Sequence, residues 1–229
     1  MQHFDQELAE FKEKLLTMAS HAEAAVRRSI EALVNRDSEL ARQVRAEDEV
    51  IDRYEVEIDE MAILLLAKAP LASDLRLITV AMKISQNLER VGDEAAKISN
   101  RARDLSQEPP LKQAPDLSKM ANLALGMLKE SLDAFVNHDP AAARSLIPRD
   151  KEVDALNKQL VRELADQMIK SPESVARCLS LMVVSKSLER IADHATNVAE
   201  EVVYLCEALD IRHTGKLRRT VAEDEAGRL

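Results

Sequence analysis

Apolar residues recur every three or four positions over most of the chain, which is the period of amphipathic α-helices. In the first half, this pattern predicts helices over about residues 5–35, 38–69 and 73–105, with short turns between them. Asp37 is placed to cap the second of these helices. The first half therefore predicts a bundle of three long helices.

The same pattern restarts after a proline-rich linker. Residues 131–139 align with residues 29–37 at an offset of 102, and residues 185–195 align with residues 85–95 at an offset of 100. Pro148 falls inside the fifth helix, where a proline removes a backbone hydrogen bond, so we expect a break there. The fold is predicted to be all-α, with six long helices in two tandem three-helix bundles. The expected division is a first bundle at 1–107, a linker at 108–115, a second bundle at 116–211, and a polar tail at 212–229 with the composition of a disordered segment.

The composition agrees with packed helices and narrows the class of protein. Aromatic residues make up only 2% of the chain, so its core must be built from aliphatic side chains and Met, as is typical of helices rather than strands. The formal net charge of −9 argues against nucleic acid as the main partner and suits cations or a basic protein surface. The longest apolar run, residues 61–67, is far shorter than the roughly 20 residues that a membrane span needs. Because no signal peptide is recognisable either, we expect a cytoplasmic protein that does not insert into membranes.

Pairs of carboxylates spaced four residues apart occur at equivalent places in the two halves. On a helix such a pair lies on one face, where two like charges cost roughly 0.2–0.5 kcal/mol that a bound cation would reverse. The helical wheel places the pairs away from the apolar stripes, on consecutive helices that can face each other across a surface groove. The candidate metal ligands are Asp48, Asp52, Glu89 and Asp93 in the first half, and Asp150, Asp154, Glu189 and Asp193 in the second.

Ligand sets made only of oxygen suit hard cations such as iron(III), manganese or magnesium, rather than a closed structural zinc site. The alternative is that these acidic faces are simply solvated and hold no ligand. The sequence contains no phosphate-binding glycine loop, no nucleophile elbow, no Cys/His metal spacing and no Glu-x-x-His pair. We therefore predict that the chain is not an enzyme.

The acidic motifs at 89–93 and 189–193, set in tandem three-helix halves, resemble those of the PhoU family of phosphate-signalling regulators. Residues 72–78, at the start of the third helix, and residues 212–215, after the last helix, are similar to that family as well. The resemblance extends from about residue 5 to residue 215. Ala192 stands where the family pattern usually has glycine.

The resemblance implies a cytoplasmic, non-enzymatic adaptor between the ATPase subunit of a phosphate ABC transporter and a sensor histidine kinase. Such an adaptor is a negative regulator of phosphate uptake and of the phosphate-starvation response. The resemblance also implies a homodimer, and iron or zinc clusters on the acidic motifs of some members. Two alternatives stay open from the residues alone: a metal-storage protein or carboxylate metalloenzyme, and a structural helical protein with inert acidic faces.

Overall fold

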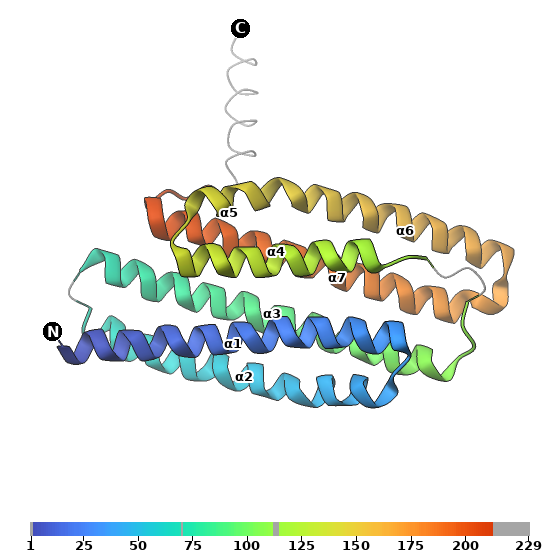
Figure 1. Cartoon of the computed structure of the whole chain (residues 1–229), viewed down its shortest axis with the longest axis horizontal. Helices are drawn as coiled ribbons and strands as arrows, with labels where there is room; N and C mark the ends of the chain where they lie inside the picture. The colour runs from blue at the N-terminus through green and yellow to red at the C-terminus, as the bar shows by residue number, and fades with distance from the viewer. Residues whose placement is uncertain (1, 70, 112–114, 213–229) are drawn as a thin grey trace, which may run out of the picture.

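The computed structural model describes residues 2–69, 71–111 and 115–212, which are almost entirely helical and include no strand. Two segments of the predicted division, residues 112–114 of the linker and residues 213–229 of the tail, lie outside the described residues. The first half consists of α1 (Gln2–Asn35), α2 (Ser38–Leu66) and α3 (Ala72–Gln107) (Figure 1). The second half consists of α4 (Ser118–Asn137), α5 (Pro140–Leu146), η1 (Ile147–Arg149), α6 (Asp150–Lys170), η2 (Pro172–Ser174) and α7 (Val175–Glu207). The predicted all-α fold of two tandem three-helix units is confirmed.

The helix boundaries follow local chemistry that recurs in both halves. Asp37 and Asp139 each accept hydrogen bonds from the backbone amides two and three residues later, which caps α2 and α5. The residue before each cap, Arg36 or His138, has a positive φ that reverses the chain direction. The predicted break at Pro148 is also confirmed, because α5 ends at Leu146 and the chain passes through η1 before α6 begins.

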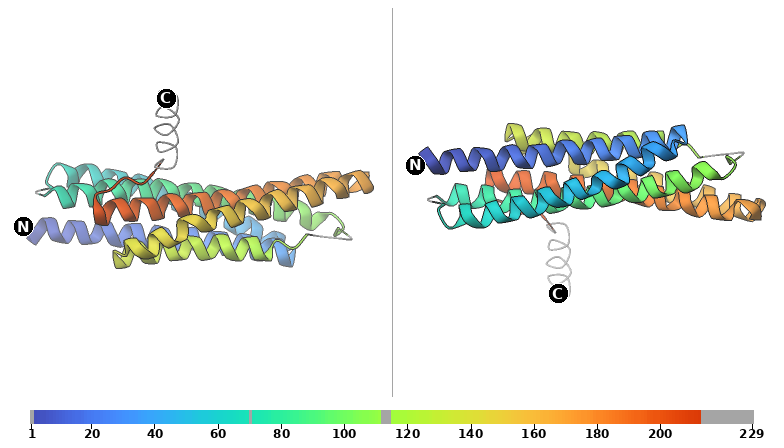
Figure 2. Two further views of the ribbon diagram at one scale, coloured as in Figure 1. Left: turned by 90° about the horizontal axis from the view of Figure 1, so that it is seen from above. Right: turned by 90° about the horizontal axis from the view of Figure 1, so that it is seen from below.

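The two halves are joined along their third helices. α3 and α7 run side by side in opposite directions (Figures 1 and 2). Two ion pairs of 3.1 Å between these helices agree with antiparallel packing. Lys83 pairs with Glu201, and Glu94, further along α3, pairs with Arg190, which comes earlier in α7. Buried apolar residues of both halves form one continuous core, in which α3 and α7 are each covered on several sides. Among the described residues, no helix is long and apolar enough to cross a membrane.

Candidate functional site

The predicted acidic pairs of the first half come together between α2 and α3, in what we call the first acidic cluster: Asp48, Asp52, Glu89 and Asp93. Burial is the main cause that raises the pKa of Asp48, and the charges of Asp52 and Asp93 raise it further. Burial likewise raises the pKa of Glu89, with a further contribution from Asp93. Pairs on consecutive helices therefore face each other, as the spacing predicted.

The second acidic cluster lies between α6 and α7 and contains Asp150, Asp154, Glu189 and Asp193. Burial, followed by the charges of Asp150 and Glu189, raises the pKa of Asp193 to about 6. Burial and the charges of Asp154 and Glu189 raise the pKa of Asp150, and a hydrogen bond with Asp193 opposes this in part. The second oxygen of Asp150, Oδ1, is buried and has no hydrogen-bond partner. These carboxylates repel one another in a partly dehydrated place, which favours a bound proton or cation.

The expectation that all eight carboxylates lie on the exposed surface is wrong. Asp48 and Glu189 are each only 9% exposed, and of the eight only Asp52 is exposed rather than buried or half-buried. The helical wheel treats each helix alone, whereas the neighbouring helix closes over the groove. The helices α2 and α3 lie so close at Gly92 that a Cβ there would be 2.9 Å from Ile51 Cδ1 and 3.2 Å from Asp48 Oδ1. At the equivalent positions of the second half, Ala192 and Val153 are both buried, and the shorter valine offsets the added methyl group.

Basic side chains neutralise much of the first acidic cluster. Arg45 pairs with Asp48 at 3.0 Å. Arg90 lies 3.3 Å from Glu89 and 3.7 Å from Asp93. Both arginine side chains are more than half exposed, so each pair contributes little to stability and can be displaced by a stronger cation.

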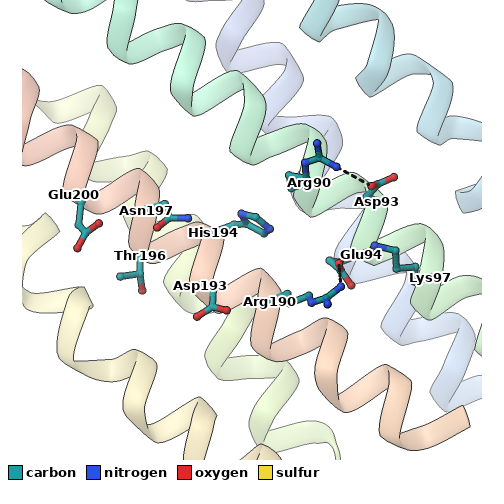
Figure 3. A pocket seen from close by; sticks show the side chains of 10 residues that line it. All are labelled: Arg90, Asp93, Glu94, Lys97, Arg190, Asp193, His194, Thr196, Asn197 and Glu200. Atoms are coloured by element: carbon teal, nitrogen blue, oxygen red, sulfur yellow. Dashed lines mark hydrogen bonds and ion pairs between the residues drawn. The ribbon is translucent and has the colours of Figure 1, made fainter. Parts of the chain in front are cut away.

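The second acidic cluster is neutralised less. Lys186 pairs with Glu189 at 2.6 Å, but Arg190, the counterpart of Arg90, reaches across to Glu94 on α3 instead (Figure 3). Among the described residues, no basic side chain lies within 4.0 Å of the remaining three carboxylates, which are Asp150, Asp154 and Asp193. Three of the four carboxylates in this cluster therefore have no basic partner among the described residues.

Two further carboxylates were missed by the sequence reasoning. Glu55 and Asp59 continue the acidic face of α2 beyond Asp52, and burial together with the charge of Asp59 raises the pKa of Glu55. Extending the search along α2 by whole turns would have found them. They were missed because only acidic residues present at equivalent positions of both halves were considered. The second-half counterparts of Glu55 and Asp59 are Asn157 and Val161, which are not acidic.

The residues of the clusters fit a hard cation. All the donors are carboxylate oxygens, which magnesium, manganese and iron(III) accept. The unpartnered Oδ1 of Asp150 offers a place for a ligand. Within the described part of the chain, however, no three His, Cys, Asp or Glu side chains are already arranged as a metal-binding group. Cation binding would thus require rotation of these side chains.

A cavity of about 500 Å³ lies between the halves and touches both clusters (Figure 3). Asp93 of the first acidic cluster and Asp193 of the second both line it. His194, also in its wall, bonds through Nδ1 to Asn87 at 3.0 Å, and burial lowers the pKa of its imidazole. The remaining lining residues are Arg90, Glu94, Lys97, Arg190, Thr196, Asn197 and Glu200.

Both halves of the chain match known proteins. The family model for the PhoU domain matches residues 15–102 and 117–202, which correspond to the two repeats. A phosphate-specific transport system accessory protein PhoU homolog from Pseudomonas putida is 41% identical over 224 residues, covering 97% of this chain and 87% of the relative. The homolog from Aquifex aeolicus is 39% identical over 208 residues, covering 90% of this chain and 94% of the relative.

Solved structures show the same architecture. The crystal structure of PhoU from Pseudomonas aeruginosa has a TM-score of 0.85 and 39% identity, over 90% of this chain and all of that one. The phosphate transport system regulatory protein PhoU from Streptococcus pneumoniae has a TM-score of 0.82 and 28% identity, over 91% of this chain and 99% of that one. With both repeats matched by the family model and relatives aligned over nearly its whole length, the chain belongs to the PhoU family.

Proposed function

We propose that this chain is a regulatory accessory protein of a phosphate-specific transport system. The observation that carries the proposal is the 41% identity to an accessory protein of such a system over 97% of this chain. The match of the PhoU domain model to both halves supports the same role.

Within this role, the chain acts in the cytoplasm as a non-catalytic negative regulator of phosphate uptake and of the phosphate-starvation response. Its partners are the ATPase subunit of the phosphate ABC transporter and a sensor histidine kinase, and it works as a homodimer. The acidic clusters support a docking role, since the second leaves three carboxylates without a basic partner. Such charge would chiefly set the rate of association and the choice of partner.

The proposal includes cations on the two acidic clusters, with iron first and zinc, manganese or magnesium as alternatives. The oxygen-only donors and the unpartnered Asp150 Oδ1 support it. Burial is the main cause that raises the pKa values of Asp48, Asp150 and Asp193, and a bound cation would offset the repulsion between carboxylates that adds to it. Cation binding would thereby change the charge that the protein presents to its partners.

Deletion of this chain from its own cells tests the regulatory role. We expect a reporter of a phosphate-starvation gene to become active in phosphate-rich medium, and expression of the full chain to restore repression. Measured phosphate uptake should rise in parallel. A reporter that stays repressed after deletion would contradict the proposal.

A further inference from the structure

The end of the α6–α7 hairpin carries exposed apolar side chains. The tip face, as we call it, consists of two residues of α6 and three of α7, and Figure 1 shows the α6–α7 turn at one extreme end of the molecule. Ile169 is 79% exposed and Leu179 is 51% exposed. The full set is Val161, Ile169, Val175, Leu179 and Val183.

These side chains form one stripe rather than scattered points. Within each helix they are separated by four or eight residues, which places them on one side. Between the helices, the antiparallel register is fixed by the hydrogen bond of 2.6 Å from Ser185 to Asn157. In this register Val161 and Val183 lie within about two residues of facing each other, as do Ile169 and Val175.

The first half carries exposed apolar side chains of its own at the end of the α2–α3 hairpin, at Ile63, Leu64, Leu71 and Leu75. At the equivalent positions of the α2–α3 hairpin, the counterparts of Val161, Leu179 and Val183 are Asp59, Thr79 and Lys83. Exposed apolar patches mark interaction surfaces, and the one on α6 and α7 differs from that of the first half in lying beside carboxylates that have no basic partner among the described residues.

The tip face continues into the second acidic cluster. Asp154 precedes Val161 by two helical turns, and Asp193 follows Val175 by five, so both lie on the same side of the hairpin as the stripe. The distance along α6 from Asp154 to Ile169 is about 22 Å at 1.5 Å per residue. A partner lying along this face would therefore meet apolar side chains at one end and unpaired carboxylates at the other.

We infer that this face of α6 and α7 is the docking site for a basic amphipathic helix of a partner protein. Its apolar side would cover the tip face, and in the cation-free protein its Lys or Arg side chains would pair with Asp150, Asp154 and Asp193. Charge complementarity favours this occupant, because these three carboxylates have no basic partner among the described residues. The patch is a narrow strip of five side chains along one hairpin, and a single amphipathic helix suits such a strip better than a second copy.

This inference rests on the proposed function only in that the chain acts by binding other proteins. Its first test places a photoreactive benzoyl-phenylalanine at Leu179 in the full chain, in phosphate-replete cells, and identifies the cross-linked segment by mass spectrometry. The matched control places it at Thr79, the exposed counterpart in the first half. We expect capture at Leu179, and not at Thr79, of a helical segment with apolar residues three or four apart and Lys or Arg at one end.

The second test measures binding of the captured segment, made as a synthetic peptide, to the purified chain. Leu179→Ser and Asp154→Asn should each raise the Kd about ten-fold. Ile63→Ser, at a first-half position that is 64% exposed, should leave it unchanged. Added salt should weaken the part of the affinity that Asp154 provides.

Several results would overturn the inference: capture of a second copy of this chain, capture of an acidic or non-helical segment, equal capture at Thr79, or no capture. If capture fails while the starvation reporter remains under the control of this chain, the docking site is wrong and the proposed function stands. If the captured basic helix belongs to a protein unrelated to phosphate transport, the docking site stands and the proposed function fails.

Discussion

Reversing one charge in each acidic cluster, with Asp52→Lys and Asp154→Lys in the same chain, is expected to leave phosphate-starvation genes active in phosphate-rich medium. The substitutions remove two candidate cation ligands and place positive charge where the proposed partners meet negative charge. Asp52 is exposed and Asp154 is half-buried, and both lie on the outer helices α2 and α6, so the fold should survive. Reporter activity should approach that of cells without the chain.

The matched control is Glu49→Lys with Glu163→Lys, which changes the net charge equally at exposed positions of the same helices. This control should keep repression, since neither residue belongs to a cluster. Protein levels and helical circular dichroism must be compared for both variants. Full repression by a stable Asp52→Lys, Asp154→Lys chain would show that the clusters do not take part in regulation.

Asp193→Asn is expected to stabilise the cation-free protein at neutral pH. Burial and neighbouring carboxylates raise the pKa of Asp193 to about 6, so the folded state favours the neutral form. Between the unfolded pKa near 4 and this value, the folded state binds more protons, and its stability falls as pH rises. The gain from asparagine should therefore be near zero at pH 4 and on the order of 2 kcal/mol at pH 7, after allowance for solvent around this half-buried group.

Urea unfolding at pH 4 and pH 7, in the presence of a chelator, measures this difference. Thr196→Val serves as a control in the same helix, because it lies outside the carboxylate cluster and does not titrate. An Asp193→Asn chain that is equally destabilised at both pH values would show that the carboxylate stabilises the fold through other contacts.

The fold was predictable because its determinants are local. Apolar stripes define the helices, Asp37 and Asp139 define two of their starts, and Pro148 defines the break between α5 and α6. The meeting of the acidic pairs followed from the same periodicity, since consecutive antiparallel helices bring equivalent turns together.

The electrostatics of the clusters were not predictable in this way. The burial of Asp48 depends on the close approach at Gly92, which a single helical wheel does not contain. The pairing of Arg190 with Glu94 depends on contact between α3 and α7, whose sequences carry no sign of their mutual register. Since His194 replaces Glu94 at the equivalent position, Arg90 has no such partner across the interface and turns to Glu89 and Asp93 instead.

We propose that the two acidic clusters are cation sites on a fold that forms without the cation. The direct measurement is thermal unfolding of the purified chain at pH 7, with a chelator and with increasing MnCl₂. The account predicts full helical circular dichroism with the chelator, and a Tm that rises with Mn²⁺ as expected for a ligand of the folded state. The rise should disappear in a chain with Asp52→Asn, Asp93→Asn, Asp154→Asn and Asp193→Asn. An unchanged Tm in the natural chain, or an equal rise in the neutralised one, would contradict it.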